Sequence, residues 1–302
     1  MTKKIYVYST GRNKTSDITR TFAHGINQSL LDYKAEYVDI QKYLDNGIPD
    51  DADGIAVLGI LRGTGLAIKE AKQKKIDYYY IDHAYFNPGY ADPCWLRVTK
   101  NSHTMNYFTK EPIDSSRYKK HFSTRNPIKK WRPRDYRGNN ILILPPTHAV
   151  KWFFDDYHWE ARIVDRLKTM LPTNEWNRIV IRTKPNEPIV DKLGNLIRIQ
   201  ESKSPSTLDH DLENAFVVIG YNSMVCLQSS LKGIPVITSP NSCCYPISFK
   251  LEDFSQSSYP FEYNNPPDVQ QLVNWLSYCQ FSLKDFRSGK AWNFIQRYQY
   301  GI

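Results

Sequence analysis

The stretch VVIGYNSMVCLQSSLKGIPVITSP, from Val217 to Pro240, contains an apolar run, a short polar turn, a helix-like segment and a second apolar run. The first run ends at Gly220, the turn is Tyr221-Asn222-Ser223, and the helix-like segment ends at Gly233. Open parallel sheets bind ligands outside the carboxyl ends of their strands, where loops meet helix N-termini. The stretch therefore predicts a strand–helix–strand unit whose polar turn lies at a binding edge.

The turn itself has two interpretations. Asn222 or Ser223 can cap the following helix, and a cap alone requires no ligand. The backbone N–H groups at the start of that helix also favour a bound phosphate. A lone Asn-Ser pair is compatible with both interpretations. Patterns elsewhere in the chain are needed to choose between them.

Apolar strand patterns and helical patterns alternate in two blocks. The first block alternates over 3–9, 18–31, 36–40, 54–60, 64–73 and 77–82. The second block alternates over 140–146, 161–170, 178–185, 215–221, 223–232, 235–240, 269–280 and 284–298. Between them, from Tyr85 to about Gly138, the periodicity fades. Alternation of this kind predicts an α/β fold with two parallel sheets covered by helices.

The composition is that of an ordinary globular chain, with 41% hydrophobic and 24% charged residues. No apolar run approaches the about 20 residues that a membrane span needs. The five cysteines form no CxxC pair, which favours free thiols in a reducing cytoplasm. No clear metal-ligand spacing is present. We therefore expect a cytoplasmic, monomeric protein with no membrane partner and no required metal.

The formal net charge of +9 is concentrated in one segment, Arg117 to Arg137. Aromatic side chains interleave with these charges, as they do on nucleic-acid contact surfaces. The segment predicts a surface for polyanions, and a solvated linker is the alternative. The candidate DNA-binding residues are Lys119, Lys120, Lys129, Lys130, Arg132 and Arg134.

The stretch 215–240 resembles the nucleotide-sugar-binding segment of GT-B glycosyltransferases that build capsules and lipopolysaccharide cores. These enzymes have an apolar strand, an Asn-Ser turn, a helix bearing a glutamate, and then Gly-x-Pro-Val-Ile. Here the turn is Asn222-Ser223 and the tail is Gly233-Ile234-Pro235-Val236-Ile237. Gln228 stands where many of these enzymes have a ribose-binding glutamate, which puts the identity of the donor in doubt.

The GT-B resemblance implies two Rossmann-like domains with parallel sheets facing a central cleft. An acceptor or DNA domain is expected at 1–138 and a nucleotide-sugar-binding domain at 139–285. A C-terminal helix at 286–302 is expected to cross back to the first domain. The implied donor substrate is a nucleotide sugar, with a UDP-sugar favoured.

A second resemblance is to proteins of tailed bacteriophages. It rests on the motifs YYYIDHAYFNPG, LRVTKNSH, WRPRDYRG-NNILILPP and FSLKDFRSGKAW. Some such phages glycosylate hydroxymethylated pyrimidines in their own DNA. The resemblance implies a hydroxymethyl-pyrimidine glycosyltransferase that acts on double-stranded DNA in the host cytoplasm.

Catalysis of an inverting sugar transfer needs a base for the acceptor's proton. Asp82 or His83, at the end of the strand pattern 77–82, is the candidate. The structural alternative is that Asp82 caps the next turn and that His83 is a hydrogen-bonded strand-end histidine. Asp17 and Asp92 are less favoured candidates for the base.

The departing phosphate needs cations or oriented dipoles. The candidate donor-binding residues follow the predicted strands of the second block, and ordinary exposed strand-end charges are the alternative for the cations. They are Thr147, His148, Arg182, Lys184, Tyr221, Asn222, Ser223 and Gln228. Weaker candidates for a phosphate-lined edge come from the first block, whose first loop lacks a full GxGxxG pattern. They are Ser9, Gly11, Arg12 and Arg62.

Three functional hypotheses follow from these patterns. The leading one is a GT-B glycosyltransferase that modifies hydroxymethyl-pyrimidines in DNA, with the target base flipped out of the stack. The second is a glycosyltransferase of surface polysaccharide biosynthesis. The third is a non-catalytic nucleic-acid-binding protein on a GT-B scaffold, which the departure at Gln228 keeps open.

Overall fold

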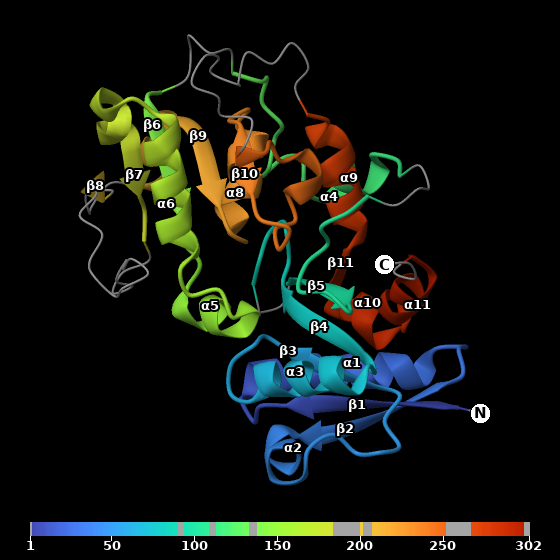
Figure 1. Ribbon diagram of the computed structural model, residues 1–302. Helices are drawn as coiled ribbons and strands as arrows, with labels where there is room; N and C mark the ends of the chain where they lie inside the picture. The colour runs from blue at the N-terminus through green and yellow to red at the C-terminus, as the bar shows by residue number, and fades with distance from the viewer. Residues whose placement is uncertain are drawn as a thin grey trace. The chain divides into compact units, whose positions relative to one another are not determined.

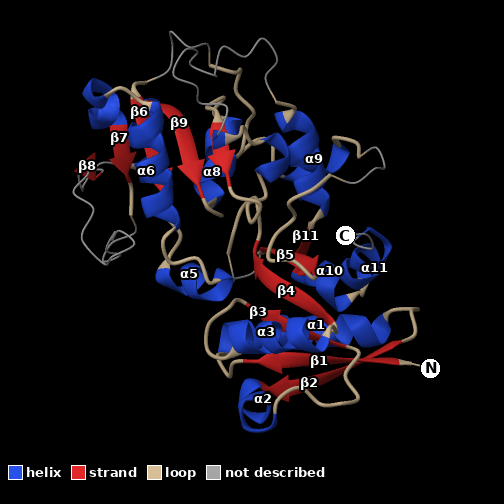
Figure 2. Cartoon of the chain, in the orientation of Figure 1, coloured by secondary structure: helices blue, strands red, loops and turns tan. Residues whose placement is uncertain are grey.

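The computed structural model describes residues 2–89, 94–108, 113–132, 138–183, 200–201, 207–251 and 267–298. The chain divides into two compact units (Figure 1). The first unit contains Met1–Met105, Thr109–Arg125 and Asn274–Ile302, and the second contains Asn106–Phe108 and Asn126–Val273. Each unit has a β-sheet with helices packed on it (Figure 2).

The first unit has a six-stranded sheet in the order β11-β5-β4-β3-β1-β2. Its strands are β1 (Lys3–Ser9), β2 (Tyr33–Asp39), β3 (Gly54–Leu58), β4 (Asp77–His83), β5 (Trp95–Lys100) and β11 (Gln280–Ser282). Strands β1 to β4 pair in parallel, whereas β5 runs antiparallel to β4 and β11 runs antiparallel to β5. The helices are α1 (Asn13–Gln28), α2 (Ile40–Asn46), α3 (Thr64–Lys74), α4 (Ser116–His121), α10 (Leu283–Arg287) and α11 (Lys290–Tyr298).

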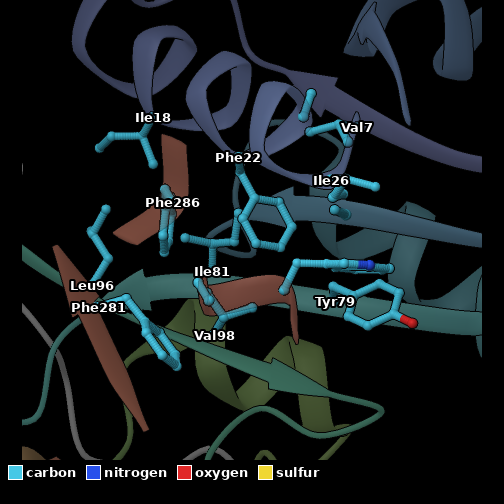
Figure 3. Packing of buried hydrophobic residues seen from close by; sticks show 14 of the residues in the cluster. Val7, Ile18, Phe22, Ile26, Tyr79, Ile81, Leu96, Val98, Phe281 and Phe286 are labelled. Atoms are coloured by element: carbon cyan, nitrogen blue, oxygen red, sulfur yellow. The ribbon is translucent and has the colours of Figure 1, made fainter. Parts of the chain in front are cut away.

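The core of the first unit follows from the alternation of side chains along its strands. Val7 and Ile81 belong to one buried cluster with Phe22 of α1, and Figure 3 shows these side chains gathered between helix and sheet. Tyr8 alternates to the opposite face, where its ring lies 5.5 Å from that of Tyr43 in α2. Burying one such large side chain contributes about 2 kcal/mol. The amphipathic patterns of the first block therefore fix which face each helix covers.

Two strands of this sheet, β5 and β11, are absent from the sequence prediction. The segment 85–138 shows no clear period because β5 carries two charged residues that are nevertheless buried, Arg97 and Lys100. Arg97 pairs with Asp82 at 3.0 Å and Lys100 pairs with Asp77 at 2.6 Å, both on the neighbouring β4. A buried charge needs such a partner, and a sequence pattern does not show where the partner lies.

The predicted last helix, 284–298, is two helices, α10 and α11, separated at Ser288-Gly289. Gly289 has a φ of +73°, a conformation that favours glycine and ends α10. The two helices pack on α1 at Gly25, where an added Cβ would lie 1.7 Å from the carbonyl oxygen of Phe286. This close approach joins the C-terminal residues to the first unit.

The second unit has a five-stranded, all-parallel sheet in the order β10-β9-β6-β7-β8. Its strands are β6 (Asn140–Leu144), β7 (Ile179–Ile181), β8 (Gln200–Glu201), β9 (Ala215–Gly220) and β10 (Val236–Thr238). Its helices are α5 (His148–Phe154), α6 (Trp159–Met170), α7 (Leu208–Glu213) and α8 (Met224–Leu231), with 3-10 turns η2 (Thr173–Arg178) and η3 (Tyr245–Ile247). Helix α9 (Val269–Tyr278) begins in this unit and ends in the first.

All six residues of β9 are buried, as expected for a central parallel strand that is covered on both faces. Ile219 and Ile143 pack with Val164 and Leu167 of α6 in one cluster. The predicted strand–helix–strand unit β9–α8–β10 is present, and the prediction of an α/β fold with two sheets dominated by parallel strands is confirmed.

Candidate functional site

The carboxyl edge of the second sheet collects polar residues from four strands. Because every strand pair in this sheet is parallel, the carboxyl ends of β6, β7, β9 and β10 meet at one edge. The residues that follow these ends are Thr147, His148, Arg182, Tyr221, Asn222, Ser223, Ser239 and Asn241. The edge therefore unites the described donor-binding candidates from three separate loops, apart from Gln228 within α8.

The turn after β9 caps helix α8. The backbone N–H of Val225 donates to Ser223 Oγ at 3.2 Å, and the N–H of Cys226 donates to the Ser223 carbonyl at 3.1 Å. Ser223 has the extended backbone (φ −69°, ψ 134°) typical of an N-cap. Of the two candidates for the cap, Ser223 provides it. Asn222 is half-buried beside it, and Gln228 is exposed one turn further along α8.

Tyr221 is a buried part of this edge, only 3% exposed. Its ring packs between Phe154 (centroids 5.6 Å apart) and Trp159 (5.5 Å). Asn241 Nδ2 donates to the Tyr221 hydroxyl at 2.8 Å, and Ser239 Oγ donates to the Tyr221 carbonyl at 2.7 Å. The Tyr221 ring therefore fixes the turn in place and leaves no open face for stacking on a ligand.

Ser239 and Asn241 were not singled out in the sequence. The signal for them was present, because the small polar residues TSPNS follow the apolar run of β10 in the same way that the turn follows β9. Asn106 Nδ2 also donates to the Pro240 carbonyl at 2.6 Å, which ties the segment Asn106–Phe108 to the same loop.

An ion pair joins the α5–α6 connection to the first turn of α6, the turn whose Trp159 packs on Tyr221. Arg162 Nη2 donates to Asp156 Oδ1 at 2.7 Å, and the Arg162 side chain is 59% exposed. Burial raises the pKa of Tyr221, the Asp156 carboxylate raises it further, and the Arg162 guanidinium lowers it. The sequence missed Arg162 because it falls inside the helical pattern of α6.

The loop after β6 leads into α5. Thr147 immediately precedes α5, and the exposed His148 ring lies 6.2 Å from that of Tyr157, which is 40% exposed. Lys151 of α5 forms a buried ion pair with Glu160 of α6. That pair fixes α5 against the first turn of α6 and so holds His148 and Tyr157 at the edge.

Arg182, the predicted phosphate cation, follows β7 at this edge. Its backbone N–H donates to the Ile143 carbonyl at 2.9 Å, which places it beside β6. Its guanidinium is hydrogen-bonded to the Asp211 carboxylate of α7, and its side chain is 29% exposed. Lys184 lies outside the described residues.

The first unit has a corresponding edge at the carboxyl ends of its parallel strands. Ser9 Oγ is hydrogen-bonded to Ser16 Oγ at 2.7 Å and accepts the Gly11 N–H at 3.3 Å. Arg12 is exposed just before α1. Arg62 is also exposed, in a left-handed conformation (φ 59°) after β3. The loop after β1 is therefore held by the hydrogen bonds of the Ser9 hydroxyl to Ser16 and Gly11.

Asp82, the first candidate for the base, accepts three hydrogen bonds. The donors are the Tyr80 hydroxyl at 2.7 Å, Arg97 Nη2 at 3.0 Å and the His83 N–H at 2.8 Å. Burial raises the pKa of Asp82, but Arg97 and the Tyr80 hydroxyl outweigh it, so the pKa lies below its usual value. A carboxylate with a lowered pKa is a weak proton acceptor.

The other candidates for the base are placed as follows. His83 follows Asp82 at the end of β4 and is exposed. The Asp17 carboxylate, 70% exposed on α1, lies 3.4 Å from Arg20 Nη1. Asp92 lies outside the described residues.

The basic segment divides between the two units, because residues up to Arg125 belong to the first and those from Asn126 to the second. Lys119 and Lys120 are exposed on α4 in the first unit. Lys129 and Lys130 are exposed in the second. Within the described part of the chain these lysines therefore do not share one unit.

Lys129 to Arg132 lies against the C-terminus of α8. The Lys129 N–H donates to the Leu231 carbonyl at 2.7 Å, and Arg132 Nε donates to the Lys232 carbonyl at 3.2 Å. An added Cβ at Gly233 would lie 2.2 Å from the Lys130 carbonyl oxygen, so the fit requires glycine. Because α8 runs back from the carboxyl edge, this segment lies at the amino edge of the sheet. Arg134 lies outside the described residues.

The described residues provide no metal-binding cluster and no membrane-spanning helix. They contain no group of three or more His, Cys, Asp or Glu side chains that could hold a metal ion. None of the helices in the described ranges is both long and apolar enough to cross a membrane.

Comparison with known proteins places the fold. No protein-family model matches the chain, and no curated protein matches it. Among solved structures, it is similar to the KpsC beta Kdo 2,4 transferase of Thermosulfurimonas dismutans, with 12% identity, a TM-score of 0.51, and coverage of 93% of this chain and 92% of that one. The KpsC beta Kdo 2,7 transferase of the same organism matches with 12% identity, a TM-score of 0.49, and coverage of 98% and 99%. A putative UDP-N-acetylglucosamine 2-epimerase from Listeria monocytogenes matches with 11% identity, a TM-score of 0.28, and coverage of 97% and 94%.

The first of these likenesses extends over nearly all of both chains. At 12% identity it shows a shared fold and not a shared activity. The predicted GT-B-like α/β architecture is therefore confirmed.

Proposed function

We propose that this protein is a glycosyltransferase that binds a nucleotide sugar at the carboxyl edge of its second sheet. The observation that carries the proposal is the capped turn Tyr221-Asn222-Ser223, fixed by Asn241 and Ser239 at the start of α8. A rigid turn at a helix start offers backbone N–H groups to a phosphate without reorganisation. The shared fold with a sugar transferase supports the same assignment.

The proposed acceptor is a glycan of surface polysaccharide biosynthesis. In the second unit, the described part of the basic segment lies apart from the proposed donor site, which does not favour DNA as the acceptor. Arg132 is engaged by the end of α8, and Lys129 and Lys130 lie at the amino edge of the sheet, away from the proposed donor site. The KpsC protein that shares the fold is named as a transferase of the sugar Kdo, which also favours a glycan product.

In the proposed transfer, the acceptor oxygen attacks the anomeric carbon as the bond to the nucleotide phosphate breaks. A base accepts the acceptor's proton, and the departing phosphate is stabilised by protein cations and helix-start amides. We assign the base to the exposed His83 and a positioning role to Asp82, because Asp82 is already held by three donors.

A panel of nucleotide sugars, with UDP-sugars first, tests this function. Each donor is incubated with oligosaccharide acceptors or with DNA containing hydroxymethylated pyrimidines, and products are identified by mass spectrometry. The proposal expects a mass increase of one sugar on an oligosaccharide. If the sugar is found on a nucleoside from the digested DNA, the acceptor is DNA and the glycan assignment is wrong. Binding of DNA with neither transfer nor nucleotide binding would favour the non-catalytic hypothesis.

A further inference from the structure

Arg162 lies near the start of the predicted helical pattern 161–170, and a helical pattern alone does not mark it as a site residue. It stands in the first turn of α6, where its backbone N–H donates to the His158 carbonyl at 3.1 Å. Trp159, in the same turn, packs its ring on Tyr221 at 5.5 Å with an interplanar angle of 84°. The first turn of α6 is therefore beside the capped turn before α8.

The Arg162 side chain is oriented and exposed at the same time. One nitrogen, Nη2, donates to Asp156 Oδ1 at 2.7 Å, and the side chain is 59% exposed. A guanidinium has five N–H donors in a planar fork that matches two phosphate oxygens. The Asp156 pair thus fixes the group without using up its capacity to bind an anion.

Arg182, at the same edge, is less exposed than Arg162 and its guanidinium is engaged in an ion pair. Its guanidinium is bonded to the Asp211 carboxylate of α7, and less than a third of its side chain is exposed. Binding a phosphate with Arg182 would mean sharing or breaking this ion pair, which links β7 to α7. Such a pair is costly to break when one partner is largely buried, as Asp211 is.

We propose that Arg162, paired with Asp156 in the helix turn whose Trp159 packs on Tyr221, binds the phosphate of the donor nucleotide. The inference rests on the proposed function, since it concerns the same donor site. It assigns the phosphate contact to a helix residue and leaves Arg182 as a structural residue. The exposed His148–Tyr157 pair on the adjoining connection lies on the same side of the unit and would flank the bound nucleotide.

The groups that face Arg162 set the expected strength of this contact. Asp156 neutralises its charge, so the contact depends on hydrogen-bond geometry more than on net field. Glu160, one residue after Trp159, is paired with Lys151 inside the unit and adds no net charge. The positive end of α6 contributes in the same direction as Arg162. A charge-assisted contact of this kind changes affinity by about 10- to 100-fold.

The test compares nucleotides with their nucleosides, because only the nucleotide carries the phosphate. UDP, CMP and GDP are titrated by calorimetry, and uridine, cytidine and guanosine are followed by ligand-observed NMR. For the nucleotide that binds most tightly, Arg162→Gln should weaken binding about 10- to 100-fold while nucleoside binding stays within about twofold. Arg162→Lys keeps the positive charge but not the planar guanidinium. Its nucleotide affinity should therefore lie between those of the wild type and of Arg162→Gln.

Arg166→Gln is the matched control, since Arg166 is exposed one turn further along α6 and undergoes the same change of charge. Its nucleotide affinity should stay within about twofold. Equal losses in Arg162→Gln and Arg166→Gln, an unchanged affinity in Arg162→Gln, or a larger loss in Arg182→Gln would each overturn the inference. Failure of the wild-type protein to bind any nucleotide would instead overturn the proposed function together with it. Thermal unfolding of each variant verifies that the fold is intact.

Discussion

The two sheets differ in the bonding and exposure of charged residues at the ends of their strands. At the end of β4 in the first unit, Asp82 is enclosed by Tyr80, Arg97 and the His83 N–H. At the corresponding edge of the second unit, Ser223 caps a helix and Arg162 stays largely exposed. The Asp82 carboxylate is paired largely within the protein, whereas the Arg162 guanidinium stays at the surface of the second unit. The difference teaches that a strand-end carboxylate can serve the fold, whereas ligand binding needs groups that the fold leaves accessible.

The largest expected effect comes from removing the partner of Asp82. Arg97→Met should lower the free energy of unfolding by about 3 to 5 kcal/mol, because it leaves a largely buried carboxylate without its cation. Arg97 also stacks over the rings of Tyr80 and Tyr85, at 5.8 and 5.5 Å, so the variant loses packing as well. Urea unfolding followed by circular dichroism measures the difference.

The exposed pair Arg20–Asp17 on α1 provides the control for this experiment. Both side chains are more than half exposed, so Arg20→Gln should change stability by no more than about 0.5 kcal/mol. If Arg97→Met lowers the free energy of unfolding by less than about 1 kcal/mol, the fold does not depend on the pairing of Asp82. The contrast between the two strand ends would then fail.

The second expected effect is a pH dependence located at the same edge. His103 stacks on Tyr80 with centroids 4.6 Å apart, and burial together with the nearby Arg97 lowers the pKa of His103 to about 3, against the opposing effect of Asp82. Below a pH of about 6.5 the unfolded chain binds a proton that the folded protein does not. Stability should therefore fall as the pH drops from 6.5 toward 3, by up to about 1.4 kcal/mol per pH unit.

Urea unfolding of the wild type and of His103→Gln at pH 7, 6 and 5 checks this dependence. The variant should show a flatter loss of stability over the interval, whatever its stability at pH 7. The lowered pKa of Asp82 acts in a separate window, since its contribution is present above the unfolded value of about 3.9 and is lost only at lower pH. Parallel curves for wild type and variant would contradict the prediction for His103.

The sequence predicted the fold well, whereas the site residues stay predictions, and particular residues show why. The β9–α8–β10 unit follows from local apolar runs and a capped turn, and all of these signals lie within 24 residues of chain. Strand β5 was missed because its burial depends on Asp82 and Asp77 of another strand. Arg162 was missed for a related reason, because only the packing of Trp159 on Tyr221 shows that α6 begins at the site.

The third prediction concerns the cap of α8. Ser223→Ala removes the hydroxyl that accepts the Val225 N–H, so stability should fall by about 1 kcal/mol. Nucleotide affinity should fall about 5- to 10-fold if the same turn holds a phosphate. Ser223→Asn supplies a different capping side chain and should recover stability more fully than affinity. Full stability in Ser223→Ala would show that the cap contributes little to the rigidity of the second edge.

The smallest expected effect lies at the other end of the second unit. Lys129 and Lys130 are exposed, and the segment is held by backbone contacts to the end of α8, which their side chains do not make. Lys129→Gln/Lys130→Gln should therefore change stability by no more than about 0.5 kcal/mol. Nucleotide affinity at 0.15 M salt should stay within about twofold, because the amino and carboxyl edges of a sheet are separated by more than the screening length of about 8 Å.

DNA binding by the same double variant shows whether the basic segment has a role of its own. If Lys129 and Lys130 contact phosphates, the slope of log affinity against log salt should become shallower by about 0.9 for each lost contact. If the acceptor is a glycan, we expect the wild type and the variant to bind unmodified duplex DNA equally weakly. The slope of log affinity against log salt should then be the same for both. A shallower slope in the variant, together with sugar transfer to DNA by the wild type, would make the amino edge a DNA-binding surface. The acceptor would then have to reach both edges of the second sheet, and the contrast that assigns ligand binding to one edge would no longer hold.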